Sequence, residues 1–329
     1  MHLYVVALLL VGAAAAGALV GVLSSGSDEP AAPPPTVPAA VTPSVPQEQD
    51  GGRGGGRATR RRTAPAGAWI RVAALRRRVA AIGRGGEVGV FVRPLGPGSP
   101  VGAGSLQTGP AWSTAKVPVV VARLRFGGDG ADPSVDALAA RAIRSSDNAA
   151  AQELFDQLSA RLGGTVPASR YVTAVLRDAG DRSTSINSRR VRPEFSTFGQ
   201  TTWALDEGTR FFSALARGCV APRAADRRVA ELMAQVTSAQ RWGLARAGRP
   251  SSRATTIKGG WGPDRDGRYL VRQFGVVREG GRGVAVGLMA TASDGGFPAG
   301  IALVDELARA VVGTVAWSRL RPARGCERA

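Results

Sequence analysis

Apolar residues recur at two different spacings along the globular part of this chain. Between residues 68 and 82 they are spaced as on one face of a helix, which predicts an amphipathic helix there. Residues 87–93 are rich in valine and phenylalanine, as in a strand, and the prolines and glycines of 94–100 turn the chain toward a returning strand at 101–106. This region is therefore predicted to form a helix followed by two strands.

Helical spacing dominates the middle of the chain, from residue 113 to residue 245. Three further strands are predicted at 255–258, 269–278 and 282–292, and a strongly apolar final helix at 298–316. Because strands lie near both ends and helices between them, the pattern predicts an α+β fold. Its sheet would be built from the two chain ends, with a helical domain inserted.

An apolar segment and a linker precede the globular part. Residues 3–23 are almost wholly apolar and long enough to cross a bilayer, so we expect an uncleaved membrane anchor. A cleavable signal peptide, which would leave a secreted protein, is the alternative, because the small residues 13–16 resemble a cleavage region. The linker is rich in proline, glycine and arginine and cannot bury a core. We therefore expect an extracytoplasmic protein with an N-terminal segment, a disordered linker, a catalytic domain and a tail at residues 1–23, 24–66, 67–317 and 318–329.

The formal net charge of +18 raises the question of a nucleic-acid partner. The glycine- and arginine-rich residues 51–57 superficially resemble RNA-binding tracts. No aromatic residue between Tyr4 and Trp69 could stack on bases, however, so we expect no nucleic acid. A basic tether beside anionic lipid or wall polymer fits the charge better. Binding to an anionic polymer stays open as a minor hypothesis.

The composition also limits the catalytic chemistry. His2 is the only histidine, and the two cysteines have no histidine partner, so histidine triads and zinc sites are excluded and we expect no cofactor. Only two of the 43 lysine and arginine residues are lysines, Lys116 and Lys258. A buried lysine can lose its proton, whereas arginine cannot. Serine activated by lysine is therefore the main nucleophilic chemistry left.

Lys116 closes the motif Ser113-Thr114-Ala115-Lys116. On a helix this spacing makes Ser113 and Lys116 neighbours, so that Lys116 could take the serine proton if burial lowers its pKa. The apolar residues 117–121 supply that burial, and backbone N–H groups at the helix start could bind an oxyanion. Taken alone, the motif also fits a capped helix with an exposed lysine.

Two further motifs follow along the chain. Ser146-Asp147-Asn148 fits a helix start, but Ser146 could also relay a proton beside the nucleophile while Asn148 binds a substrate amide. Lys258-Gly259-Gly260 fits an exposed lysine before a turn. It could equally place a lysine on a strand to hold Ser146 and a substrate carboxylate, with the glycines, including Gly260, letting substrate approach.

The three motifs in this order resemble those of the serine beta-lactamase/penicillin-binding protein superfamily, and of class A beta-lactamase-like serine hydrolases in particular, over roughly residues 69–317. The resemblance implies a five-stranded antiparallel sheet flanked by helices, an inserted helical domain and an active site in the cleft. It also implies an acyl-enzyme on Ser113 and a second oxyanion donor in the backbone N–H of Trp261.

The chain also departs from that family. Gly259 stands where the family has threonine or serine, so a hydroxyl for a substrate carboxylate is missing, and Arg272 on the next strand is the candidate replacement. The short interval between the first two motifs implies a trimmed helical domain. In the loop 183–198 the one acid, Glu194, is the candidate deacylation base, although a surface residue fits it equally well.

These features favour an extracytoplasmic serine hydrolase or acyltransferase that forms an acyl-enzyme with a beta-lactam or a cell-wall peptide. The alternative is a non-hydrolytic or deacylation-deficient module that binds peptidoglycan or its precursors. We expect a monomer. In an oxidising compartment Cys219 and Cys326 could form the single possible intramolecular disulfide, and two unpaired thiols are the other outcome.

Overall fold

The computed structural model describes residues 68–127, 132–247, 253–323 and 325–326. The expected membrane segment and linker, residues 1–23 and 24–66, lie outside the described residues. Within the described ranges no helix combines the length and the apolar character needed to cross a membrane.

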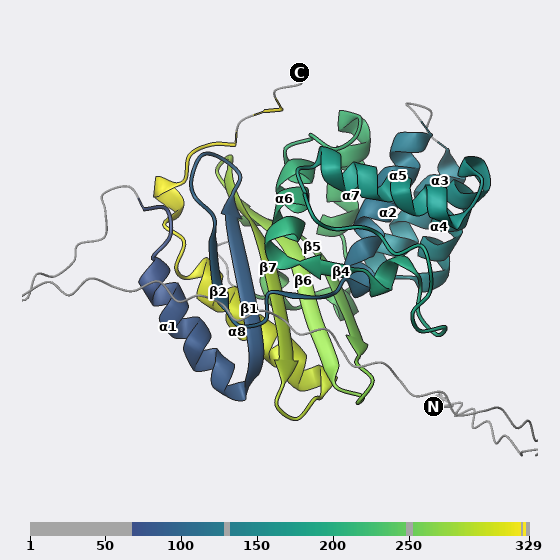
Figure 1. Ribbon diagram of the computed structural model, residues 1–329. Coiled ribbons are helices and arrows are strands. Elements are labelled where there is room, and N and C mark those ends of the chain that lie inside the picture. The colour runs from purple at the N-terminus through teal and green to yellow at the C-terminus, as the bar shows by residue number, and fades with distance from the viewer. Residues whose placement is uncertain (1–67, 128–131, 248–252, 324, 327–329) are drawn as a thin grey trace, which may run out of the picture. The chain divides into compact units, whose positions relative to one another are not determined.

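A five-stranded antiparallel sheet forms the centre of the domain, in the order β2-β1-β7-β6-β5 (Figure 1). Two strands come from the N-terminal part of the domain and three from its C-terminal part, so the sheet is built from the two chain ends. The predicted α+β class with this sheet is confirmed. The strand bounds are β1 Gly86–Pro94, β2 Val101–Gly104, β5 Arg253–Pro263, β6 Tyr269–Glu279 and β7 Arg282–Ala292.

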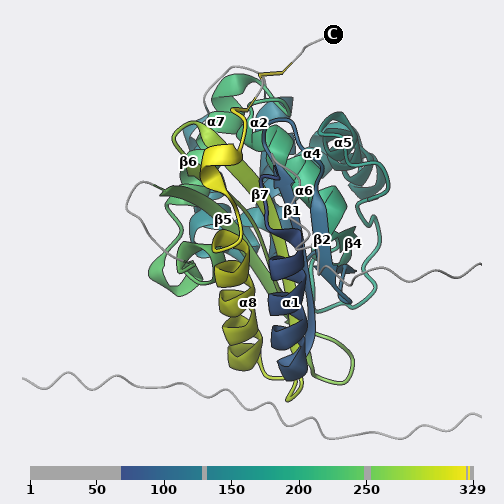
Figure 2. The ribbon, with the colours of Figure 1, turned by 90° about the vertical axis from the view of Figure 1, so that its left-hand side faces the viewer.

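Helices α1 (Val72–Ile82) and α8 (Phe297–Val312) lie side by side on one face of the sheet (Figure 2). The apolar positions of both helices face inward, and Leu75 and Leu307, for example, are completely buried. They form one core cluster with the side chains that β1, β6 and β7 present on this face. Helix α8 ends at Val312, before Ala316 where the sequence predicts its end, because the chain leaves the helix so that Val315 forms a β-bridge with Ile70.

The helices on the opposite face form a second core that continues into a helical domain (Figure 1). Helix α6 (Leu205–Ala216) packs on the sheet, and α2 is completely buried along residues 117–122, as its apolar sequence predicts. The remaining helices are α2 Lys116–Phe126, α3 Pro133–Ala140, α4 Asn148–Leu162, α5 Thr165–Asp178 and α7 Arg223–Ala234.

The region predicted to be mainly helical also contains a short strand, β4 (Thr202–Ala204). It pairs with β3 (Thr108–Pro110), which lies before that region, to form a small second sheet. Strand β5 is much longer than the predicted 255–258. Glycine is depleted in ordinary strands, so the glycines of β5 kept the sequence pattern from predicting the whole strand. They are required here because β5 lies very close to neighbouring backbone.

Candidate active site

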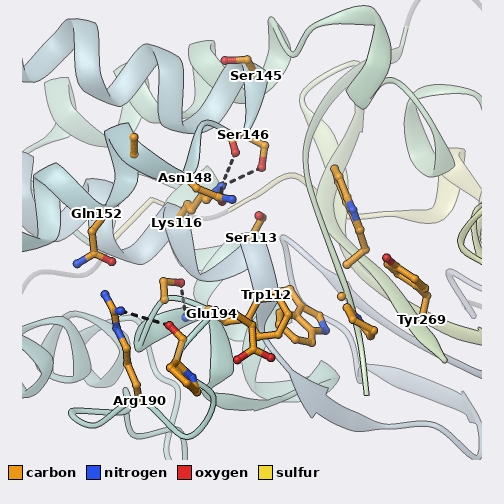
Figure 3. A pocket seen from close by; sticks show the side chains of 18 of the residues that line it. Trp112, Ser113, Lys116, Ser145, Ser146, Asn148, Gln152, Arg190, Glu194 and Tyr269 are labelled. Carbon is orange, nitrogen blue, oxygen red and sulfur yellow. Dashed lines mark hydrogen bonds between the residues drawn. The ribbon is translucent and has the colours of Figure 1, made fainter. Parts of the chain in front are cut away.

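A cavity of about 550 Å³ lies between β5 and the helical domain (Figure 3). It is lined by residues of the first two motifs, by the residues that directly follow the third, and by the loop that holds Glu194. The predicted site residues on its wall are Ser113, Lys116, Ser146, Asn148, Glu194 and Trp261. Three other predicted site residues, Lys258, Gly260 and Arg272, do not line it.

Ser113 lies on a short 3-10 turn, Trp112–Ala115, that leads directly into α2. Its neighbour Trp112 has a φ of 47°, a left-handed conformation that is strained for a bulky residue and that persists only where the surroundings enforce it. The indole of Trp112 packs edge-on against Phe195, with ring centroids 4.9 Å apart. The Thr114 hydroxyl donates to the carbonyl of Ala111 at 2.5 Å. These contacts fix the turn and hence the position of Ser113.

Lys116, the first residue of α2, is only 2% exposed. Its Nζ donates to Asn148 Oδ1 at 2.7 Å, to Ser146 Oγ at 3.2 Å and to the Ser146 carbonyl. Burial lowers the pKa of Lys116 to about 8, although the carboxylate of Asp147 opposes this shift. The sequence predicts a direct bond from Lys116 to Ser113. In the structure the ammonium group is turned toward Ser146 and Asn148 instead.

The second motif serves both as a helix start and as part of the site. Asp147 caps α4 by accepting the Ala150 N–H at 3.0 Å, and it also pairs with Arg141. Ser146 has a φ of 61°, again left-handed. This bend directs Ser146 and Asn148 toward Lys116 while Asp147 faces the helix. The motif can therefore begin helix α4 and line the cavity at the same time.

Lys258 lies on β5 and is 1% exposed. Its Nζ donates to Ser146 Oγ at 2.8 Å and to the carbonyl of Gly259 at 2.9 Å. Burial lowers the pKa of Lys258 well below its usual value, and the positive charge of Lys116 lowers it further. Ser146 Oγ thus bridges two lysines, both of which are biased toward the neutral form.

Gly260 and Gly259 allow β5 to pack closely against its neighbours. A β-carbon on Gly260 would lie 2.9 Å from the backbone nitrogens of both Ser113 and Thr114, so only glycine lets the strand meet the turn that holds Ser113. A β-carbon on Gly259 would lie 2.4 Å from the indole of Trp242. The hydroxyl expected at the middle of the third motif is therefore replaced by a tryptophan ring from another segment.

The prediction that Arg272 binds a substrate carboxylate is wrong. Its side chain is completely buried and donates to the carbonyls of Gly109 and Pro110, both at 2.9 Å, and of Trp203 at 3.1 Å. These acceptors lie on β3 and β4, so Arg272 links the small sheet to β6. The sequence could not reveal these contacts of Arg272, because they depend on which backbone carbonyls the folded chain brings against its strand.

Glu194 reaches the cavity with a side chain that is 52% exposed. Its Oε1 accepts a hydrogen bond from Arg192 Nε at 2.9 Å, and Arg192 in turn stacks on Phe195 and donates to the Pro263 carbonyl at 2.6 Å. The pKa of Glu194 is lowered, first by a hydrogen bond from its own backbone N–H and then by Arg192. A carboxylate held in this way is a weak general base.

Several cavity residues carry no sequence signal that could have revealed them. One comes from α4, one turn beyond the second motif, and the others come from the loop before β4, from the segment after α7 and from the start of β6, where no motif is recognisable. Among them are Gln152, Arg190, Phe195, Gln240 and Tyr269. Within the part of the chain that the structure describes, no group of histidine, cysteine, aspartate and glutamate side chains could hold a metal ion.

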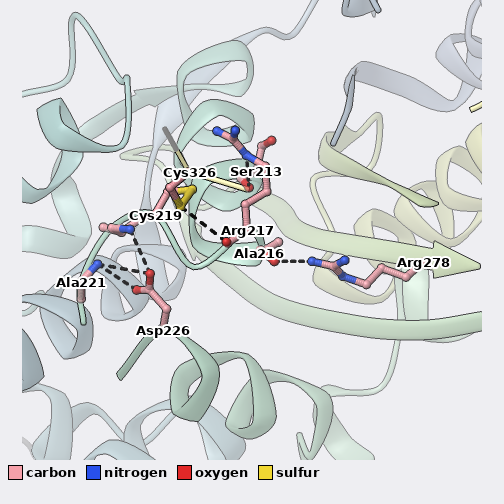
Figure 4. Close-up of a disulfide and its surroundings, with 9 residues drawn as sticks. Ser213, Ala216, Arg217, Cys219, Ala221, Asp226, Arg278 and Cys326 are labelled. Atoms are coloured by element: carbon pink, nitrogen blue, oxygen red, sulfur yellow. Dashed lines mark hydrogen bonds between the residues drawn. A yellow bond between two sulfur atoms is a disulfide. The ribbon is translucent and has the colours of Figure 1, made fainter. Parts of the chain in front are cut away.

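Away from the cavity, Cys219 and Cys326 form a disulfide with their Cα atoms 5.5 Å apart (Figure 4). Cys219 follows α6, and Cys326 lies 107 residues later in the C-terminal tail. The bond therefore ties the tail to the end of α6. This is the one intramolecular pairing that the sequence allows.

Comparison with known proteins identifies the family of the chain and solved structures with a similar fold. A model of the beta-lactamase enzyme family matches residues 123–315, which include the second and third motifs but begin after Lys116. No curated protein sequence matches the chain.

Solved structures of class A beta-lactamases share the fold at low sequence identity. The enzyme from Mycobacterium abscessus has a TM-score of 0.59 and 18% identity over 73% of this chain and 98% of its own. An ancestral class A enzyme of Gram-negative bacteria has a TM-score of 0.57 and 23% identity over 73% and 99%. A beta-lactamase from Burkholderia vietnamiensis has a TM-score of 0.58 and 21% identity over 73% and 96%. By its family match and its fold, the chain belongs to the beta-lactamase enzyme family.

Proposed function

We propose that this protein is an extracytoplasmic serine hydrolase or acyltransferase whose Ser113 is acylated by a beta-lactam or a cell-wall peptide. One observation carries the proposal. The hydroxyl of Ser146 accepts hydrogen bonds from both Lys116 and Lys258, and this relay opens onto the same cavity as Ser113. Such a relay is suited to moving a proton between Ser113 and the leaving group.

In the proposed reaction Ser113 Oγ attacks the substrate carbonyl and gives its proton to neutral Lys116, directly or through Ser146. The carbonyl oxygen becomes an oxyanion, which the backbone N–H groups of Ser113 and Trp261 stabilise. Collapse of this intermediate breaks the bond to the leaving group, and Ser146 protonates the departing atom. Lys116 then passes the proton that it took from Ser113 to Ser146, and Lys258 holds the Ser146 hydroxyl in place. The lowered pKa of Lys116 supports its role as the base.

Asn148 is suited to hold the acyl part of the substrate. Its Oδ1 is occupied by Lys116 Nζ at 2.7 Å, which fixes the orientation of the amide. The NH₂ group is left to donate to a substrate carbonyl. The same hydrogen bond positions Lys116, so Asn148 orients both the substrate and the base.

A deacylation-deficient binding module is the second candidate, and the environment of Glu194 favours it. The bond to Arg192 and the lowered pKa make Glu194 a poor activator of water. Loss of the acyl group would then be slow compared with its formation. The protein would trap its ligand as a long-lived acyl-enzyme.

The extracytoplasmic location is part of this proposal. The apolar residues 3–23 would anchor the chain in the membrane, with signal cleavage as the alternative. The disulfide between Cys219 and Cys326 supports a location outside the cytoplasm, because such bonds persist in oxidising compartments.

Covalent labelling tests the proposed function. The purified protein would be incubated with a fluorescent penicillin and, separately, with an uncharged thioester, and bound label would be measured on denaturing gels and by intact mass. We expect stoichiometric labelling by at least one probe and none in Ser113→Ala. Labelling of Ser113→Ala to the level of the natural sequence would contradict the assignment of the nucleophile.

A further inference from the structure

The cavity wall around Ser146 determines which leaving groups the site accepts. If Ser146 protonates the departing atom, as the proposed function requires, then the leaving group occupies the space beside this residue. The Thr237 N–H donates to the Arg144 carbonyl at 2.9 Å, which holds the turn Ser238–Gln240 against the segment that ends at Ser146. Ser145 and Gln240 line the cavity there. Both side chains are polar and uncharged.

Among the described residues, no lysine or arginine side chain on this side of the cavity is free to bind a ligand. Lys116 and Arg190 are the only lysine or arginine residues of the described chain on the cavity wall. The Nζ of Lys116 already contacts three protein acceptors, so its hydrogens are engaged within the protein and not with a ligand. Figure 3 shows Arg190 across the cavity from Ser146, near Glu194.

Lys258 on β5 and Arg272 on β6 are buried and do not reach the cavity. Lys258 is 1% exposed, does not line the cavity and is bonded to Ser146 and Gly259. Arg272 is completely buried and donates to three backbone carbonyls. Neither ammonium nor guanidinium group faces a bound leaving group.

A hydroxyl donor is also absent from the middle of the third motif. Gly259 has no side chain, and the indole of Trp242 fills the space that one would occupy. Nearby, Gln240 is 7% exposed and its Oε1 forms no hydrogen bond, so a neutral N–H or O–H of a ligand could satisfy it. A carboxylate would instead meet this acceptor without a compensating cation, which is costly in a shielded site.

From this wall we infer that the site selects acyl donors whose leaving group bears no carboxylate. The substrate class is then an ester, or an amide bond inside a longer chain, rather than a bond to a terminal amino acid with a free carboxylate. This inference rests on the proposed function. It narrows the cell-wall peptides considered there to those cleaved or joined at an internal bond.

Two thioesters that share one acyl group test the inference. One releases 3-mercaptopropionate and the other 3-mercaptopropionamide, so the leaving groups differ in charge but little in size. The acylation rate of Ser113 by each is followed by intact mass and divided by the rate of uncatalysed hydrolysis of the same ester. We expect the neutral leaving group to react at least about tenfold faster, the factor for leaving one buried polar group unsatisfied. Equal rates, or a faster carboxylate, would overturn the inference.

A matched pair of variants tests whether the cavity wall at Gln240 causes the preference for a neutral leaving group. Gln240→Arg puts a cation on the cavity wall and should shift the ratio of the two rates toward the carboxylate by about tenfold. Gln235→Arg adds the same charge nearby on the exposed end of α7, outside the cavity, and should keep the original ratio. An unchanged ratio in Gln240→Arg, or equal shifts in both variants, would overturn the inference. If Gln240→Arg does not fold, the two rates of the natural sequence decide. Failure of both esters to label Ser113 would contradict the proposed function itself.

Discussion

Lys258 Nζ lies 2.8 Å from Ser146 Oγ, although 112 residues separate them in the chain. Lys258 is held by a strand of the sheet and Ser146 by a turn of the helical domain. Lys116 completes the group from the start of α2. The relay therefore forms only when the sheet and the helical domain are packed together.

Removal of the bridging hydroxyl should slow acylation severely. In Ser146→Ala the two lysines lose their shared acceptor and the leaving group loses its proton donor. We expect the second-order rate constant for acylation by the neutral thioester to fall by about 10²–10⁴. Ser159→Ala, on the outer part of α4, is the control and should react like the natural sequence. A loss of less than about threefold in Ser146→Ala would show that Ser146 carries no proton.

The acylation rate should depend on pH through Lys116. Because the base must be neutral and burial lowers its pKa to about 8, the rate should rise as the pH increases toward about 8 and level off above it. Lys116→Arg keeps the charge but cannot release the proton, so it should be at least about a hundredfold slower and should lose this rise. Stopped-flow acylation at a series of pH values measures both effects. A rate that stays constant across this range in the natural sequence would exclude Lys116 as the base.

Deacylation should be slow and independent of Glu194. The carboxylate is bound to Arg192 and its pKa is lowered, so Glu194→Gln should leave the rate of acyl-enzyme loss within about twofold of the natural value. Pre-steady-state kinetics with the neutral thioester should show a burst of one equivalent of thiol and then slow turnover. Rapid multiple turnover that disappears in Glu194→Gln would make Glu194 the deacylating base after all.

The disulfide should contribute measurably to stability. It joins residues 107 apart, and closing so long a loop restricts the unfolded chain. We expect the double variant Cys219→Ser and Cys326→Ser to lose about 2–5 kcal/mol of unfolding free energy in urea. Thiol titration of the denatured, unreduced protein should find no free thiol. Two free thiols per chain would show that the bond is not formed.

The sequence predicts the fold well wherever periodicity and burial agree. Strand β7 runs from Arg282 to Ala292, as its apolar pattern predicts, and α2 is buried along its valine-rich stretch. Prediction was poorer for β5, whose glycines conceal a strand of 11 residues. Close backbone packing requires these glycines, and sequence periodicity does not record such packing.

Prediction of the site residues from the sequence also succeeded only in part. The three motifs identify Ser113, Lys116, Ser146 and Lys258, because lysine is so rare in this chain that its positions are informative. They do not reveal that Lys116 bonds to Ser146 in place of Ser113, or that Arg272 faces buried carbonyls. Those details depend on which residues the folded chain brings together over long distances.

Peptide mapping of the acylated protein tests the central claim most directly. The protein would be quenched in acid shortly after exposure to the neutral thioester and digested, and the modified peptide would be sequenced by tandem mass spectrometry. We expect one acyl group per chain, located on Ser113, in both the natural sequence and the slower Ser146→Ala variant. An acyl group on Ser146 or Ser145, or labelling spread over surface residues, would contradict it.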